Sequence, residues 1–311
     1  MHFSVMILGA GSAKPVANKY PSAQLLTYDN ECFLIDCGEG TQYRLLEHKI
    51  RPGRLRGVFI SHLHGDHYFG LIGLLSSLNL GGRTEEFFLV GPRGLDEIIT
   101  LHFKYSQTPL HFPIIYTITD TESSYQVFEN QNFTVTTIPL DHRIPCAGYL
   151  FREKPQKRKL IKEKLLDDMP HEYLRKLKNG EDVVDEAGNV LFKCLEFTTP
   201  APLPRSYAYC SDTRYNESII EVIQGVDLLY HEATFRDELE QQAFERYHAT
   251  AKQAGIIAAK SHVKKLLIGH FSSRYKEFSG FLEDAQTVFQ ATEIAEEGKV
   301  FAIEAQPTSI I

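Results

Sequence analysis

The chain has 311 residues, of which 43% are hydrophobic and 23% charged, a composition typical of a soluble globular protein. No run of eighteen or more apolar residues occurs, which excludes a transmembrane span, and the short apolar N-terminus leads directly into Gly11, Lys14 and Pro15, unlike a signal peptide. The net charge of −7 argues weakly against a nucleic-acid partner, and five cysteines without a CxxC pair fit a reducing cytoplasm.

The pattern of apolar residues predicts short strands separated by helices along the first half of the chain. The expected strands are residues 2–9, 22–28, 32–36, 55–60, 86–90, 114–118, 125–128 and 133–138. The expected helices are residues 39–49, 68–79 and 95–105. A tight turn at Asp29-Asn30 joins the second and third strands.

A similar pattern resumes in the last third of the chain. Strands are expected at residues 206–210, 227–231 and 264–269, with a short helix between the first two. Longer helices are expected at residues 251–259 and 281–297. Two β-rich regions with helices between their strands predict an α/β fold in which two sheets pack face to face and helices cover the outside.

A basic segment lies between these two regions. Residues 152–178 contain ten Lys or Arg and five acids, a net charge of +5, so the rest of the chain carries −12. A local basic segment on an acidic body could contact phosphate groups, although a solvated amphipathic helix explains the segment by itself equally well. We therefore expect one domain over residues 1–311, with residues 152–190 as an inserted basic arm.

The clearest chemical signal is residues 61–67, Ser-His-Leu-His-Gly-Asp-His, directly after the strand predicted at 55–60. Imidazole and carboxylate groups are the ligands that zinc and similar metals prefer. His62 and His64 alternate along an extended turn and could bind one metal, whereas Asp66 and His67 have the opposite phase and could reach a second. Four such groups packed without a metal would repel and desolvate one another.

Three further ligand-type residues each follow a predicted strand: His142, Asp212 and His270. Taken singly, Asp212 could be a helix N-cap, and the two histidines could be half-buried polar residues. Together with the cluster at 62–67 they supply seven ligands at strand ends, as a dinuclear metal site needs.

These motifs resemble the metallo-β-lactamase fold, an αββα sandwich of two mixed sheets, and within it the ribonuclease Z family of endonucleases that trim precursor tRNA at its 3′ end. The resemblance is carried by residues 61–71, 140–149, 211–214, 231–235, 247–250 and 269–275. Two stretches and one residue differ from the family pattern, the residue being Ala249 where the family usually has Ser. The loop at residues 15–20 departs at three of four marked positions, and residues 169–176 lack the Gly-Pro element of the family's tRNA-binding arm.

The resemblance implies two Zn²⁺ per subunit, with Mn²⁺ or Fe²⁺ as substitutes. It assigns His62, His64 and His142 to one ion, Asp66, His67 and His270 to the other, and Asp212 to both. Asp66 would also accept a proton from the attacking water. His248, oriented by Glu232, would protonate the leaving oxygen.

The resemblance also implies how the substrate is held. Ser272, Ser273 and Arg274 would lie beside the scissile phosphate. The arm would contact phosphates away from the chemistry through its basic residues, namely Lys157, Arg158, Lys159, Arg175, Lys176 and Lys178. The products would be a tRNA with a 3′-OH and a trailer with a 5′-phosphate. The family further suggests a cytoplasmic homodimer in which one subunit's arm serves the other's active site, with no membrane partner.

Two other functions remain compatible with the sequence. One is a dinuclear hydrolase of the same fold that acts on a small phosphodiester, thioester or lactone. The other is a tRNA- or metal-binding protein with a dormant site. The basic arm and residues 231–234 argue against the first alternative, and the full set of ligands with His248 argues against the second.

Overall fold

The computed structural model describes residues 2–14 and 16–305, so Pro15 of the expected substrate loop lies outside the described part. The chain divides into two compact units. The larger unit combines the chain up to Arg152 with Ser206–Ile303. The smaller unit, here called the arm unit, holds Glu153–Arg205 and, of the described residues, also 304–305.

The larger unit contains two seven-stranded sheets. The first sheet has the order β18-β1-β2-β3-β4-β5-β6. Its strands are β1 Phe3–Gly9, β2 Ala23–Tyr28, β3 Glu31–Cys37, β4 Leu55–Phe59, β5 Phe87–Pro92, β6 Ile114–Thr119 and β18 Val300–Ala302. The second sheet has the order β17-β16-β15-β14-β9-β8-β7. Its strands are β7 Gln126–Glu129, β8 Phe133–Pro139, β9 Ala147–Glu153, β14 Ser206–Cys210, β15 Leu228–Glu232, β16 Leu266–Gly269 and β17 Thr292–Ile294.

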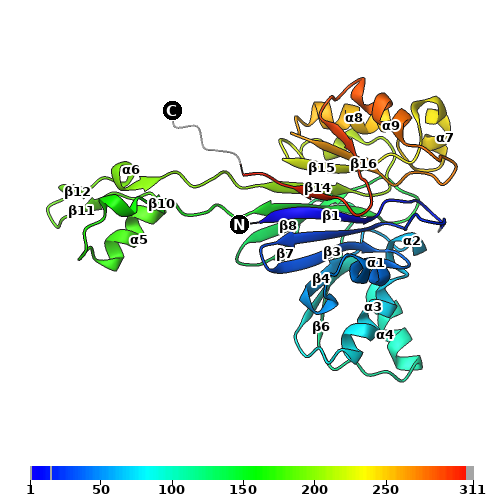
Figure 1. The fold of residues 1–311 in the computed structure, drawn as a ribbon, viewed down its shortest axis with the longest axis horizontal. Coiled ribbons are helices and arrows are strands. Elements are labelled where there is room, and N and C mark those ends of the chain that lie inside the picture. Colours follow the sequence, from blue (N-terminus) through cyan, green and yellow to red (C-terminus); the bar gives the residue numbers. More distant parts are fainter. Residues whose placement is uncertain (1, 15, 306–311) are drawn as a thin grey trace. The chain divides into compact units, whose positions relative to one another are not determined.

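The two sheets face each other, and helices cover their outer faces (Figure 1). The first sheet is covered by α1 Thr41–Glu47, α2 Gly65–Tyr68, α3 Leu71–Leu80 and α4 Leu95–Tyr105. The second is covered by α7 Glu240–Glu245, α8 Ala251–Lys260 and α9 Ser279–Gln286. Single 3₁₀ turns lie at η1 Pro52–Arg54, η3 Glu217–Ile219 and η4 Asp237–Leu239. No helix in the described part of the chain is both long and apolar enough to cross a membrane.

Aromatic side chains from both sheets form the layer between them. Phe59 is fully buried and makes edge-on contacts with the rings of Tyr149 and Phe151, at centroid distances of 5.3 and 5.1 Å. Separate apolar clusters fill the space between each sheet and its helices. Because both faces of the central strands are buried, these strands are apolar at nearly every position, and polar side chains collect at the strand ends.

The strand ends place the candidate site. Strands β3, β4, β5 and β6 run parallel to one another, as do β14, β15 and β16. The carboxyl ends of parallel strands meet at one edge of a sheet, where α/β proteins commonly bind ligands. The turn after β4 and the loops after β14 and β16 therefore bring their polar residues to the same edge of the sandwich.

The arm unit has a small core of its own, made by Met169, Leu177, Val183 and Cys194. Its elements are β10 Lys159–Leu160, η2 Lys162–Lys164, α5 His171–Asn179, β11 Val183–Val184, β12 Val190–Phe192, α6 Cys194–Phe197 and β13 Thr198–Thr199. Strand β10 pairs with β13, and β11 pairs with β12. The two ends of the unit are joined, because Arg205 forms an ion pair with Glu153 at 2.7 Å. The unit thus continues past residue 190, the expected end of the arm.

Most predicted elements lie where the sequence placed them, and one is wrong in its second half. The helix predicted at 281–297 ends at Gln286, and Thr292–Ile294 forms β17, parallel to β16. Apolar spacing alone cannot separate a short buried strand from a helix turn, and pairing with β16 decides the structure here. Strands β9 and β18 were not predicted. The helix expected at 68–79 is divided into α2 and α3, with Gly70 packed against the backbone of Gly38.

Candidate metal centre

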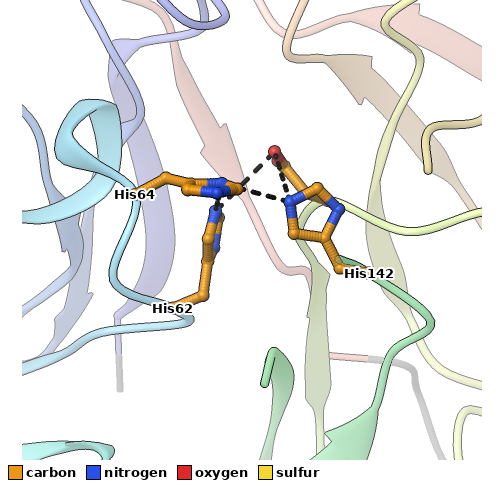
Figure 2. Close-up of side chains that lie close together, drawn as sticks. His62, His64 and His142 are labelled. Carbon is orange, nitrogen blue, oxygen red and sulfur yellow. Dashed lines mark hydrogen bonds and ion pairs between the residues drawn. The ribbon is translucent and has the colours of Figure 1, made fainter. Parts of the chain in front are cut away.

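Four ligand-type groups meet at the first candidate metal position. His62 and His64 come from the turn after β4, and His142 from the loop after β8 (Figure 2). The Nδ1 atom of His64 lies 3.0 Å from Nε2 of His62 and 3.1 Å from Nε2 of His142. The Oδ2 atom of Asp212 lies 3.8 Å from both of these Nε2 atoms. Three nitrogens and one oxygen therefore converge on one point.

A second group forms beside the first from Asp66, His67 and His270, whose ligand atoms all lie within 4.8 Å of one another. The Oδ2 atom of Asp66 lies 3.5 Å from Nε2 of His67 and 3.6 Å from Nε2 of His270. The other oxygen of Asp212, Oδ1, lies 3.5 Å from Nε2 of His67 and 3.2 Å from Nε2 of His270. Asp212 thus turns one carboxylate oxygen toward each group, as a bridging ligand would.

In three imidazoles, the ring nitrogen that points away from the candidate metal positions forms a hydrogen bond, and this bond fixes which nitrogen carries the proton. His142 Nδ1 donates to the backbone oxygen of Tyr247 at 3.0 Å. His67 Nδ1 donates to Asp36 Oδ2 at 2.7 Å. His270 Nδ1 lies 2.9 Å from the hydroxyl of Thr234, which itself donates to Glu232 at 2.7 Å and is therefore free to accept. With Nδ1 protonated in all three, each Nε2 directs a lone pair into the site, the arrangement typical of metal-binding histidines.

Hydrogen bonds within the protein satisfy this arrangement only in part. His67 Nε2, His270 Nε2 and Asp212 Oδ1 are buried and have no hydrogen-bond partner among the described residues. Nitrogen lone pairs that face carboxylate oxygens at 3.2–3.6 Å repel one another unless positive charge lies between them. The donor set of imidazole and carboxylate suits zinc, manganese or iron. The residues present therefore fit a pair of divalent cations.

The pKa shifts describe the same need for positive charge. Burial lowers the pKa of His67, but the carboxylates of Asp212, Asp36 and Asp66 outweigh burial and raise it well above the usual value. Burial and the neighbouring imidazole of His67 lower the pKa of His62 well below its usual value, so this ring is neutral. Burial opposes ionisation of Asp66 and Asp212, but the adjacent imidazoles hold the pKa of both carboxyls well below the ordinary range.

The sequence analysis missed Asp36, which organises one side of the site. This fully buried carboxylate accepts hydrogen bonds from the Ser61 backbone at 2.8 Å, the Ser61 hydroxyl at 2.9 Å and the Tyr209 hydroxyl at 2.7 Å, in addition to His67. Its φ of 56° places it in the left-handed region at the end of β3. A single acid that ends an apolar strand, followed by Cys37-Gly38, was the available signal.

Glu232 and His248 form a separate pair at the edge of the site. Glu232 is fully buried, and its Oε1 accepts hydrogen bonds from Nδ1 of His248 at 2.8 Å and from the Thr213 backbone at 3.1 Å. Burial lowers the pKa of His248, but the charge and hydrogen bond of Glu232 outweigh it and raise that pKa to about 9. His248 also lies within ligand distance of Asp212 and His270. Because Glu232 raises the pKa of this imidazole to about 9, His248 is better suited to donate a proton than to bind a metal.

A cavity of about 450 Å³ opens onto these groups. Its lining includes His64, Asp66, Asp212, His248, His270, Ser272 and Arg274. The exposed Ser273 is not part of this lining. The cavity is also lined by Arg143 and Arg246, which the sequence analysis did not select although each is close to a selected histidine. Cationic side chains therefore surround the entrance to a strongly anionic floor. A cavity of about 520 Å³ beside α4 and β6 is mostly apolar and contains none of the ligand-type residues.

The six basic residues selected in the arm differ in their surroundings. Lys157, Lys159, Arg175 and Lys178 are exposed. Lys176 is half-buried and lies 3.4 Å from Glu172. Arg158 donates through Nε to Thr198 at 2.7 Å and so supports the arm unit itself.

Comparison with known proteins identifies the family of the chain. A protein of Cytophaga hutchinsonii named ribonuclease Z is 50% identical over 303 residues, which cover 97% of both chains. The chain belongs to the ribonuclease Z family. A second protein of that name, from Bacteroides fragilis, is 43% identical over 297 residues and covers 95% of this chain and 97% of its own.

Solved structures share the fold of this chain, and one family model matches its first part. Human tRNase Z, short form, superposes with a TM-score of 0.70 at 28% identity, covering 97% of this chain and 99% of its own. The metallo-β-lactamase fold protein YhfI from Bacillus subtilis, at 20% identity and a TM-score of 0.68, shares the fold and covers 97% of this chain and 100% of its own. The family model described as anti-Pycsar protein Apyc1 matches residues 3–151, somewhat less than half of the chain. The predicted αββα sandwich is confirmed.

Replacing Asp36 with Asn should weaken metal binding while preserving the fold. The substitution keeps the shape of the side chain but removes the charge that orients His67 and Ser61. Loss of such a supporting group typically costs about 10- to 100-fold in metal affinity. Zinc affinity measured by competition with a chelator tests this, with the exposed Asp120→Asn as the matched control. Unchanged zinc affinity in Asp36→Asn would mean that the carboxylate is only structural.

Proposed function

We propose that this protein is a metal-dependent endoribonuclease that removes the 3′ trailer of precursor tRNA, leaving a 3′-OH on the tRNA and a 5′-phosphate on the trailer. One observation carries the proposal. In a chain 50% identical to a ribonuclease Z over 97% of its length, seven metal-type ligands form two adjacent groups, and four of them line one cavity together with His248. This arrangement would supply both the metal ligands and the proton donor that phosphodiester cleavage needs.

The metal assignment follows the two groups of ligands. His62, His64 and His142 would hold one Zn²⁺, Asp66, His67 and His270 the other, and Asp212 both, with Mn²⁺ or Fe²⁺ as alternatives. When bound, two such ions supply Lewis acidity toward the phosphate oxygens and toward an attacking water.

The chain's own residues would move the protons. Asp66 lines the cavity with a more exposed side chain than Asp212, and its Oδ2 accepts a hydrogen bond from the backbone N–H of Ala13 at 2.7 Å. It can accept the proton of the attacking water. On the other side, His248 remains an imidazolium at neutral pH because its pKa is about 9. It can protonate the leaving 3′-oxygen, which departs poorly as an alkoxide.

The substrate would be held both near the site and far from it. Ser272, Ser273 and Arg274 belong beside the scissile phosphate, and Arg143 and Arg246 add positive charge at the cavity entrance. The exposed basic residues of the arm would contact tRNA phosphates at a distance from the chemistry. We further propose that the protein acts as a homodimer in which one subunit's arm serves the other's active site.

The main competing function is hydrolysis of a small phosphodiester at the same site. The family model described as anti-Pycsar protein Apyc1 matches residues 3–151, which include the four ligand-type residues of the turn at 62–67 and also His142. The Glu232–His248 pair and the arm unit lie outside that match.

Incubation with a 3′-extended precursor tRNA tests the proposed function directly. The wild-type protein should release a trailer with a 5′-phosphate, and a chelator should abolish the reaction until zinc or manganese is added back. Asp66→Ala, which removes a proposed ligand and the proposed base together, should remain folded and inactive. Hydrolysis of a small diester without cleavage of precursor tRNA would favour the competing function, and no turnover of either would indicate a dormant site.

Replacing His248 with Ala should lower the rate without releasing metal. The loss of a general acid typically costs about 10²- to 10⁴-fold. The defect should be large on precursor tRNA and small on a nitrophenyl phosphodiester, because nitrophenolate leaves without protonation. Metal content is measured in parallel. Equal losses on both substrates would reassign His248 to metal binding or to structure.

Replacing the arm should separate binding from chemistry. The pairing of Glu153 with Arg205 brings the two ends of the arm together, so a short Gly-Ser linker can replace residues 156–202. Hydrolysis of the small diester should continue at nearly the normal rate, whereas tRNA should bind much more weakly. The slope of log affinity against log salt should flatten by roughly 0.7–0.9 for each phosphate that the arm no longer neutralises.

A matched variant separates the charge of the arm from its shape. It retains the arm but carries Gln at the four exposed basic positions, namely Lys157, Lys159, Arg175 and Lys178. This variant should show most of the flattening of the salt slope that we expect when the arm is replaced. Unchanged tRNA affinity and slope in both variants would show that RNA is gripped elsewhere.

A further inference from the structure

Tyr247 has an unusual backbone conformation at the end of α7. Its φ is 62°, in the left-handed region that favours glycine. The N–H of His248 bonds to the oxygen of Ala243 at 2.9 Å, and the N–H of Tyr247 to the oxygen of Phe244 at 3.2 Å. These two bonds form a Schellman cap, in which glycine normally occupies the position of Tyr247. A large side chain is strained in this conformation, and contacts of its ring can compensate for the strain.

The Tyr247–His248 peptide joins two parts of the candidate site. The oxygen of Tyr247 accepts the hydrogen bond from Nδ1 of His142, which turns Nε2 of that ring toward the first metal position. The next residue is His248, the proposed proton donor. The orientation of one proposed metal ligand and the position of the acid therefore both depend on this single cap.

Arg214 holds the cap in place. Its guanidinium lies 3.5 Å from the ring centre of Tyr247 and 4.1 Å from that of Phe244. Its Nε donates to the oxygen of Phe244 at 2.7 Å. Planar guanidinium groups stack on aromatic rings and donate in a fixed direction at the same time, which an ammonium group cannot reproduce.

The other end of Arg214 is anchored to the metal-binding loops. Its backbone N–H bonds to the oxygen of Asp141 at 2.9 Å, directly before His142. The preceding residue, Thr213, donates to Oε1 of Glu232 at 3.1 Å, the same oxygen that binds His248. Arg214 thus extends from the loop that carries Asp212 to the turn that carries His248.

We propose that Arg214 is a positioning residue for the proposed reaction, which keeps His142 and His248 in register by stacking on Tyr247. This role rests on the proposed function but does not require Arg214 to contact RNA. Only 20% of its side chain is exposed, and its Nε is already committed to the protein.

A double-mutant cycle with His248 tests the kinetic part of this proposal. Under zinc-replete conditions, Arg214→Ala should slow cleavage of precursor tRNA about 10²-fold, the usual cost of misplacing a reacting group by about 1 Å. Hydrolysis of a nitrophenyl phosphodiester should remain near the wild-type rate. In the His248→Ala background, Arg214→Ala should cost almost nothing further, because the two residues act through one step.

Substitutions at Tyr247 provide the control for folding. Tyr247→Gly relieves the backbone strain, so the protein should fold at least as stably, but it removes the ring on which Arg214 stacks, so the cap is no longer held in place and activity should fall as in Arg214→Ala. Tyr247→Phe keeps the ring and should restore the wild-type rate. Arg56→Ala, which breaks a surface ion pair with Glu85, should match the wild type throughout.

A binding measurement tests the same role without catalysis. Because His142 is oriented through Tyr247, both Arg214→Ala and Tyr247→Gly should lower zinc affinity by about 10- to 100-fold in chelator competition. Additive rate losses in the cycle, equal losses on both substrates, or unchanged zinc affinity in both variants would overturn the role of Arg214. A wild-type protein that leaves precursor tRNA intact would instead overturn the proposed function, and the zinc measurement would still decide the role of Arg214.

Discussion

Four carboxylates, Asp36, Asp66, Asp212 and Glu232, lie buried or nearly buried at one edge of the sandwich, and the surrounding structure depends on compensating them. A buried carboxylate without a charge partner is strongly destabilising. Imidazoles provide part of the compensation. In His67, His142 and His270 the Nδ1 atom is hydrogen-bonded to the protein, which leaves Nε2 available to a cation. Positive charge at this edge would therefore stabilise the loops after β4, β8, β14 and β16 together. Several of these loop conformations would be unfavourable in isolation. His270 and Asp36, for example, both have a positive φ.

The sequence was informative wherever the chemistry is local. The turn at 62–67 contains four ligand-type residues in six positions, and His142, Asp212 and His270 could be found because each follows an apolar strand. The two-sheet architecture was also predictable from strand and helix spacing. Residues whose role arises only after distant segments meet could not be found in this way. Asp36 contacts Ser61 and Tyr209 through the fold, Arg214 reaches Tyr247 across 33 positions, and β17 is a strand only because β16 lies beside it.

The arm unit illustrates a different limit of sequence reasoning. Its basic residues were visible, but its extent was not, because Val183 and Cys194 belong to its core although they follow the charged stretch. Its basic character is also local. Glu181, Asp182, Asp185 and Glu186 follow the cationic segment directly, so positive and negative charge occupy successive parts of one small unit. Of the basic side chains, Arg158 serves the unit's own structure. A count of charges along the sequence therefore overstates how many are available to a partner.

The proposed ligands are dispersed along the chain between His62 and His270, and they come from loops of both sheets. This dispersion has a consequence for synthesis on the ribosome. When the turn at 62–67 leaves the exit tunnel, it carries four ligand-type side chains but lacks the partners that complete either group. The first group is complete only after Asp212 has emerged, and the second only after His270. A nascent chain that has emerged only as far as Asp212 could thus complete the first group but not the second, and the capacity to cut RNA should arise only after His270 has emerged and the second sheet can close on the first.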